Sequence, residues 1–199
     1  MPRVYVAIGG NIEPERCFVL AARALHRRFP GIVFSACYRN PAFGFKGADF
    51  LNAVAGFDSN ASVEQILAEL HAIEVQCGRR REDPKWAPRA MDIDLLLYGG
   101  TVAETAAYRL PRPDLLRRSY MLAPLAQIAP ELQHPLTGRT MADHWQELAR
   151  EPHRLEPLGL DLNVLGGAQA PAAVDGENLP GDVGRRSSEE NHGRGDVGR

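Results

Sequence analysis

The sequence predicts an α+β domain in which helices pack on an antiparallel sheet. Strand-like and helix-like segments follow one another in the order β-α-β-β-α-β over residues 3–98. The chain has 199 residues, of which 44% are hydrophobic and 24% charged, as in ordinary globular proteins. That length and composition are sufficient for one well-packed core.

The first strand and the first helix lie near the N-terminus. The segment RVYVAI, residues 3–8, is rich in β-forming residues and ends at the turn cluster Gly9-Gly10-Asn11. Pro14 suits the first turn of a helix. That helix is predicted to run to about Phe29, because apolar residues recur at helical spacing.

Two strands and a loop are predicted next. Residues 31–39, GIVFSACYR, alternate between apolar and polar side chains as a strand does. A loop that bears glycines and aromatic residues follows them. The apolar run FLNAVAGF, residues 50–57, predicts the third strand.

The second helix and the fourth strand complete the core. Ser62 and Gln65 form a capping-box pattern that opens a helix through about Gln76, and Gly78 marks its end. The run MDIDLLLY, residues 91–98, predicts the fourth strand. The resulting order is the split-βαβ, or ferredoxin-like, arrangement. Short helices are expected after it.

The end of the chain differs in composition from the rest. Aromatic residues disappear, Gly, Pro, Asp and Arg dominate, and GDVGR occurs twice. Such a segment buries too little apolar area to offset its chain entropy. We therefore predict a folded domain over residues 1–158 and a disordered tail over residues 159–199.

Charge and cysteine content narrow the function classes. The formal net charge is −2, with cations concentrated near residues 79–89, which favours a small anionic ligand over a long polyanion. Three cysteines without a C-x-x-C pair indicate neither a disulfide framework nor a zinc site. No apolar run approaches the roughly 18 residues of a membrane span, and no export signal is recognisable. We expect a cytoplasmic monomer that binds neither membrane nor nucleic acid.

Asp92 and Asp94 lie in the predicted fourth strand, one residue apart. Residues i and i+2 of a strand point to the same face, so the two carboxylates are side by side. Without a counter-charge, one of them is expected to hold a proton. Mg²⁺ would remove this repulsion, since it takes oxygen ligands, usually alongside phosphate. The alternative is a pair that is solvated or bridged to arginine.

Cations and aromatic residues accompany the aspartates. Arg79, Arg80, Arg81, Lys85 and Arg89 precede them closely, and arginine forks bind phosphate oxygens. The phosphate-binding loop G-x-x-x-x-G-K-[ST] is absent from the sequence, so side chains and metal would have to hold a phosphate. Asn52, placed inside an apolar run, suits reading the edge of a flat heterocycle. The aromatic residues of the same cluster, each of which taken alone is more often a core residue, are Phe43, Phe45, Phe50, Trp86 and Tyr120.

Five collinear blocks resemble one family. KWAPRAMDIDLL, residues 85–96, resembles the signature of the 6-hydroxymethyl-7,8-dihydropterin pyrophosphokinases. VAIGGN (6–11) resembles the family's opening strand and turn, and YRNPAFG (38–44) with FLNAV (50–54) its pterin pocket. IEVQCGRRR (73–81) and RSYMLAPLAQIAP (118–130) resemble two further blocks. The similarity spans roughly residues 3–150.

The resemblance implies transfer of pyrophosphate from ATP to the pterin hydroxymethyl group, with release of AMP, in folate biosynthesis. It implies two Mg²⁺ ions on Asp92 and Asp94, which with Arg79 and Arg89 form the catalytic set. The implied ATP-binding residues are Glu74, Arg79, Arg81, Lys85, Trp86, Arg89, Arg112 and Arg118. The implied pterin-binding residues are Asn40, Pro41, Phe43, Phe50, Asn52, Trp86 and Tyr120. Asp94 is our hypothesis for a general base, if the reaction uses one.

Departures from the family pattern leave alternatives open. Gly10 stands where the family usually has Ser, with little effect expected, and Arg112 stands where it usually has His. An arginine is a permanent cation, so a paralogue that acts on a modified pterin stays open. Other readings are a different Mg²⁺-dependent D-x-D transferase and a ferredoxin-like RNA-binding module, against which the two aspartates argue. The loops at 40–50 and 78–88 are candidate lids.

Overall fold

A computed structural model gives the fold, and it describes residues 1–41, 47–79, 88–151 and 153–166. The elements follow in the order β1 (Arg3–Gly10), α1 (Pro14–Arg28), β2 (Val33–Phe34), β3 (Cys37–Asn40), β4 (Phe50–Asp58), α2 (Val63–Gln76), β5 (Asp92–Tyr98), β6 (Ala103–Glu104), β7 (Arg109–Leu110), η1 (Leu115–Arg117), α3 (Ser119–Ile128), α4 (Met141–Leu148), β8 (Glu156–Leu158) and η2 (Asn163–Gly166). The predicted α+β, ferredoxin-like class is confirmed.

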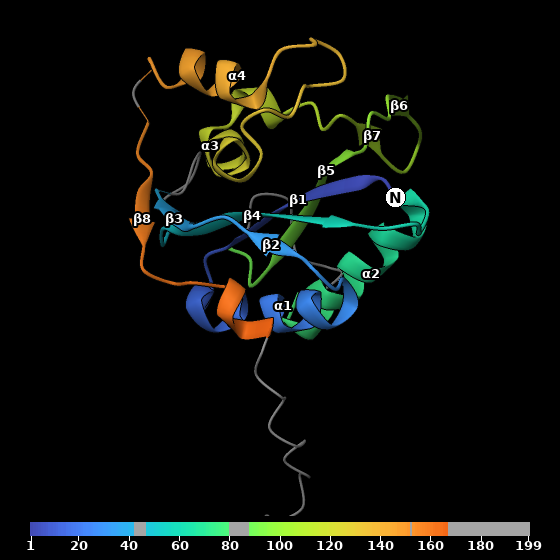
Figure 1. Ribbon diagram of the computed structural model, residues 1–199. Helices are drawn as coiled ribbons and strands as arrows, with labels where there is room; N and C mark the ends of the chain where they lie inside the picture. The colour runs from blue at the N-terminus through green and yellow to red at the C-terminus, as the bar shows by residue number, and fades with distance from the viewer. Residues whose placement is uncertain (42–46, 80–87, 152, 167–199) are drawn as a thin grey trace, which may run out of the picture. The chain divides into compact units, whose positions relative to one another are not determined.

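The main sheet is antiparallel and lies between two layers of helices (Figure 1). Its strands are ordered β5-β1-β4-β3-β8, and β2 also pairs with β4. The helices α1 and α2 cover one face, and α3 and α4 cover the other. Because β1 and β4 are central and covered on both faces, they are almost continuously apolar and buried.

Alternation along β1 divides the core into two clusters. Val4, Val6 and Ile8 pack in the cluster under α1 and α2. Tyr5 and Ala7 pack in the second cluster, with residues of α3 and α4. Since successive strand residues point to opposite faces, each residue of β1 is assigned to one helical layer by its position alone.

The two predicted helices are confirmed at their ends. Pro14 occupies the first turn of α1, which runs to Arg28. The hydroxyl of Ser62 accepts a hydrogen bond from the backbone N–H of Gln65, and the Gln65 side chain returns a bond to Ser62. This capping box satisfies two N–H groups that a helix start leaves without partners. The helix α2 ends at Gln76, as expected.

The strand predicted at residues 31–39 is broken in two. Phe34 pairs with Ala55 and Tyr38 pairs with Asn52, so the register moves by one residue between these pairs. Ser35 lies at the break, where its hydroxyl accepts from the backbone N–H of Val54 at 2.9 Å. An extra residue in one strand is a β-bulge, and it bends β3 away from the line of β2.

The C-terminal part of the described chain contains elements that were not predicted from the sequence. The strand β8 pairs with β3. Leu162 is fully buried, and its carbonyl lies 2.9 Å from His26 Nε2 on α1. Asn163 exchanges hydrogen bonds with the backbone of Phe34. Residues 159–166 therefore pack on the core, in contrast to the disorder predicted from residue 159, and the tail beyond 166 lies outside the described residues.

The length and the apolar content of a helix decide whether it could cross a membrane. Among the residues that the structure describes, no helix has both the length and the apolar content that crossing a membrane requires.

A buried histidine lies in the turn between α3 and α4. His134 is 4% exposed, its Nδ1 lies 3.3 Å from the N–H of Leu136, and its ring meets the ring of His144 edge-on at 5.9 Å. Burial, and then the positive charge of His144, lower the pKa of His134. Burial also lowers the pKa of His144. The fold therefore favours neutral imidazoles here.

We predict that acid weakens this layer through His134. A lowered folded-state pKa gives stability that is present above the unfolded pKa of about 6.5 and is lost as pH falls through the folded value. The free energy of urea unfolding should therefore fall less between pH 7.5 and 5.5 in His134→Gln than in the wild type. The exposed His153→Gln is the control. Equal pH slopes in wild type and His134→Gln would contradict the prediction.

Candidate active site

The strand β5 presents both aspartates on the sheet face that α3 and α4 cover. Asp92 pairs with Gly9 and Asp94 pairs with Ala7, whose side chain lies in the second cluster. Directly paired residues of an antiparallel sheet share a face, so both carboxylates lie on the side of that cluster. Since β5 is an edge strand, they stand at the rim of the sheet.

Arginine guanidinium groups hold both carboxylates. Arg79 Nη1 donates to Asp92 Oδ1 at 2.7 Å, and Arg89 Nη1 donates to Asp92 Oδ2 at 2.6 Å. Arg112 Nη1 lies 2.8 Å from Asp94 Oδ1. The sequence left open either a metal-binding pair or an arginine-bridged pair, and this geometry is arginine-bridged. Charge-assisted contacts of this kind offset the repulsion between neighbouring acids.

Glu74 connects the end of α2 to β5, at the edge of the sheet. The side chain is 4% exposed, and it accepts a hydrogen bond from the backbone N–H of Ile93 at 2.7 Å. It also forms an ion pair with Arg79 and lies 3.2 Å from His71 Nδ1. Burial is the main cause that raises the pKa of Glu74, while the Ile93 N–H and Arg79 act against it. Glu74 thus positions Arg79 against Asp92.

The negative charge of Asp94 is costly in this environment. Burial first, and then the neighbouring charge of Asp92, raise the pKa of Asp94 to about 6, although Arg112 acts in the opposite direction. Near neutral pH, Asp94 therefore takes up a proton more readily than an ordinary aspartate does. This is the behaviour expected of two carboxylates on one strand face.

Asn11 fixes the backbone of Arg89, a role that the sequence analysis did not foresee. Asn11 Oδ1 accepts from the N–H of Arg89 at 2.7 Å, and the N–H of Asn11 donates to the Arg89 carbonyl at 2.8 Å. Asn11 Nδ2 also donates to the carbonyl of Ala48 at 3.3 Å. The amide of Asn11 directly after the end of β1 was the available signal, since a buried amide needs partners.

Gly10 allows the same segment to approach β1. A Cβ atom at residue 10 would lie 2.5 Å from the carbonyl oxygen of Ala90, which is closer than real contacts allow. The absence of a side chain therefore lets residues 89–90 lie directly against the end of β1. The sequence analysis expected little effect from Gly in place of Ser, and the close approach is a physical reason for the glycine.

The predicted pterin residues are partly brought together. Asn52 lies across Gly9 from Asp92, and its Nδ2 donates to Asn40 Oδ1. Asn40 Nδ2 donates to the carbonyl of Pro41 at 3.0 Å. Phe50 begins β4. Tyr120 is half-buried on α3, and its pKa is raised by burial above all.

Arg118 directly precedes α3, on the layer that faces the aspartates. Residues 42–46 and 80–87 of the two candidate lids, which include the predicted residues Phe43, Phe45, Arg81, Lys85 and Trp86, lie outside the described residues. The structure brings six of the predicted site residues into two neighbouring groups of ion pairs: Glu74, Arg79, Asp92 and Arg89 form one group, and Asp94 and Arg112 form the other.

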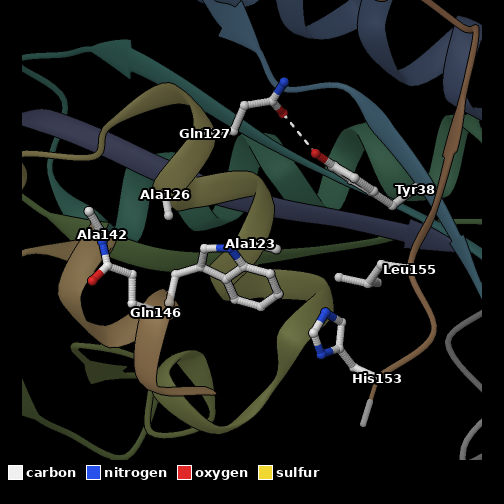
Figure 2. A pocket seen from close by; sticks show the side chains of 9 residues that line it. Tyr38, Ala123, Ala126, Gln127, Ala142, Gln146, His153 and Leu155 are labelled. Carbon is white, nitrogen blue, oxygen red and sulfur yellow. Dashed lines mark hydrogen bonds between the residues drawn. The ribbon is translucent and has the colours of Figure 1, made fainter. Parts of the chain in front are cut away.

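A separate pocket lies further along the same face. Figure 2 shows it between β3, α3, α4 and residues 153–155, with a volume of about 340 Å³. Tyr38 lines it, and the phenol donates to Gln127 Oε1 at 3.3 Å. Tyr38 pairs with Asn52, so this pocket is one strand away from the candidate pterin side. Its lining includes none of the predicted site residues.

Comparisons with known proteins all indicate the same family. The family model described as 7,8-dihydro-6-hydroxymethylpterin-pyrophosphokinase (HPPK) matches residues 5–130. The 2-amino-4-hydroxy-6-hydroxymethyldihydropteridine pyrophosphokinase of Synechocystis sp. is 37% identical over 139 residues, which are 68% of this chain and 71% of the relative. The enzyme of the same name from Methylorubrum extorquens is 36% identical over 165 residues, 81% of this chain and 98% of the relative.

Solved structures show the same fold at low identity. The Plasmodium falciparum HPPK-DHPS wild type with pteroate superposes with a TM-score of 0.60 at 10% identity, over 79% of this chain. This chain spans 47% of the length of that protein. At such identity the likeness concerns the fold alone.

We predict that Gly10→Ala displaces the Arg89 segment. The added methyl group meets the Ala90 carbonyl, so unfolding free energy should fall by about 1–3 kcal/mol, as in other overpacked sites. The control is Gly100→Ala, because a Cβ at residue 100 meets nothing within 4 Å. Urea unfolding of the three proteins measures the difference. Equal stability of Gly10→Ala and Gly100→Ala would count against the close approach.

A second prediction concerns the charge of Asp94 in chelator-treated protein. A folded-state pKa raised to about 6 means that ionisation costs stability as pH rises from about 4 to about 6, and the full cost remains at higher pH. Asp94→Asn should therefore be more stable than wild type at pH 7.5, by on the order of 2 kcal/mol. The difference should shrink toward pH 4. A less stable Asp94→Asn at pH 7.5 would refute this cost.

Proposed function

The chain belongs to the 7,8-dihydro-6-hydroxymethylpterin-pyrophosphokinase family, and we propose that it transfers pyrophosphate from ATP to the hydroxymethyl group of 6-hydroxymethyl-7,8-dihydropterin. The products would be AMP and the pterin diphosphate, an intermediate of folate biosynthesis. The observation that carries the proposal is the carboxylate pair of β5 enclosed by three guanidinium groups. Such a site suits a metal-bound polyphosphate better than a neutral ligand.

Asp92 and Asp94 would hold Mg²⁺, two ions by our proposal. The donor set fits, because hard carboxylate oxygens on one face are the ligands that Mg²⁺ takes beside phosphate. The contacts of Arg79 and Arg89 with Asp92 do not exclude the metal, since each carboxylate oxygen has two lone-pair sites. When bound there, Mg²⁺ would neutralise charge on the transferred group and lower the pKa of the attacking hydroxyl.

The arginines would bind and orient the triphosphate. Arg79 and Arg89 already converge on Asp92 from opposite oxygens, so their guanidinium groups lie beside the place where the phosphates would reach the metal. Glu74 fixes Arg79, and Asn11 fixes the backbone of Arg89. Pre-positioned cations of this kind stabilise charge in phosphoryl transfer without reorganising during the reaction.

Asn52, on β4, would form hydrogen bonds with the edge of the pterin ring. It lies two strands from Asp92 in the same row across Gly9, a separation of roughly 10 Å at the usual strand spacing. A pterin ring at Asn52 would therefore extend its hydroxymethyl group toward the aspartates. The amide of Asn52 would exchange Asn40 for the ring edge, and Tyr120 and Phe50 would contribute aromatic surface.

Other properties belong to the proposal as well. We propose that the chain acts as a cytoplasmic monomer on small molecules and binds no nucleic acid. A paralogue that uses a modified pterin stays an alternative, because Arg112 replaces the family's usual histidine. Asp94 stays our hypothesis for a general base.

The test is AMP formation from ATP with and without the pterin. Wild type should release AMP only when 6-hydroxymethyl-7,8-dihydropterin and Mg²⁺ are both present. Asp92→Ala should reduce turnover by on the order of 10²–10³, the usual cost of removing a pre-positioned electrostatic group. Asp58→Ala is the matched control, since Asp58 is an exposed acid paired with Arg3 at the far end of β4.

Two results would overturn the proposal. The first is pterin-independent AMP release. The second is an Asp92→Ala variant as active as Asp58→Ala. Activity with other pterins but not with this one would support the paralogue.

A further inference from the structure

Arg112 differs from the other arginines of the site in how it is held. Its backbone N–H donates to the carbonyl of Leu96 at 2.9 Å, so the residue is fixed to β5 itself. Its guanidinium reaches Asp94, two residues along the same strand, at 2.8 Å. The two groups form an ion pair without the alignment of a hydrogen bond, whereas the contacts of Arg79 and Arg89 with Asp92 have that alignment.

The guanidinium of Arg112 also has an unused donor. Within the described part of the chain, Arg112 Nε is buried and has no hydrogen-bond partner. A buried donor without a partner costs about 1–3 kcal/mol. An arginine whose lasting partner was Asp94 would be expected to use two donors in a fork. The contact with Asp94 therefore leaves Arg112 short of one acceptor.

The unpartnered Nε of Arg112 and its poorly aligned ion pair with Asp94 together indicate a second partner that has several anionic oxygens. Arg112 side-chain exposure is 30%, so the group is accessible from solvent while its backbone stays fixed. The carboxylate of Asp94 lies on the same strand face as that of Asp92, so a cation beside it is needed wherever no metal ion is present.

We propose that Arg112 is an exchangeable counter-ion of Asp94, which holds the carboxylate until a divalent cation takes it and then binds the nucleotide's phosphates. This inference rests on the proposed function. Arg112 acts as a positioning residue for the metal site and as a phosphate ligand in the loaded site. The first role weakens binding of a free metal ion, and the second strengthens binding of the metal–nucleotide complex.

The sign of each effect follows from charge. A guanidinium at Asp94 repels an incoming dication and must be displaced by it, so Arg112 weakens binding of a metal ion alone. With a nucleotide present, the displaced guanidinium gains anionic oxygens for Nη1 and Nε, so Arg112 strengthens binding of the metal–nucleotide complex. A residue with a merely structural role would not move these two affinities in opposite directions.

The experiment compares Arg112→Met with Arg109→Met. Arg109 is three residues earlier, is 60% exposed and pairs with Glu104 at 3.5 Å, so its loss changes net charge equally but outside the site. Binding of Mn²⁺ alone is measured by electron paramagnetic resonance at pH 8.5. Binding of α,β-methylene-ATP with Mg²⁺ is measured by calorimetry, because this analogue cannot be cleaved between its α and β phosphates.

We expect Arg112→Met to bind Mn²⁺ about three- to tenfold more tightly than wild type and the nucleotide complex about tenfold more weakly. Arg109→Met should stay within about twofold of wild type in both. Arg112→Gln, a second neutral variant, should repeat the opposite shifts and serves if Arg112→Met does not fold. Mn²⁺ affinity that is unchanged or weaker in the neutral variants overturns the inference.

The wild-type transfer assay separates this inference from the proposed function. Opposite shifts in the two affinities uphold the counter-ion even if wild type forms no AMP with the pterin, in which case the proposed function alone fails. An active wild type whose Arg112 variants show no opposite shifts leaves the proposed function standing and removes the counter-ion.

Discussion

The site depends on one constraint: two carboxylates on the same face of an edge strand must each have a cation. Asp92 meets this constraint with Arg79 and Arg89, and Asp94 meets it with Arg112. The surrounding structure supplies those cations in place. Glu74 brings the end of α2 to β5, and the segment before β5 lies against β1 because residue 10 has no side chain. Helix, turn and strand are thereby tied to the same pair of acids.

Periodicity and local chemistry were sufficient to predict most of the fold. Alternation predicts that Asp92 and Asp94 share a face, and the register of β5 on β1 agrees. The capping box at Ser62 is a contact within one turn, so the sequence carries it directly. Features of this kind depend on neighbours a few residues apart, and they are the ones that sequence reasoning recovers.

Features that depend on distant segments were not predicted. The bulge at Ser35 requires β4, and the role of Asn11 requires the backbone of Arg89, 78 residues later in the chain. Leu162 was assigned to a disordered tail by composition, but its burial beside α1 and the hydrogen bonds of Asn163 with Phe34 hold that turn against the core. Which arginine serves which aspartate is likewise decided by packing, because every arginine near the site has the same charge.

Residue 112 is an arginine where the family pattern implied by the resemblance has a histidine, and this difference bears on how the site responds to pH. An imidazole would change its own charge between about pH 5 and 8, whereas a guanidinium stays charged throughout. One group of the described site that titrates near this range is Asp94, whose pKa is raised to about 6 by burial and by Asp92. Loss of a proton there brings a negative charge to a permanent cation, so the pair becomes more tightly held as pH rises. Well above that pKa, a metal ion would meet a fully ionised carboxylate together with its competing arginine, and the proposed exchange would depend on the two cations alone.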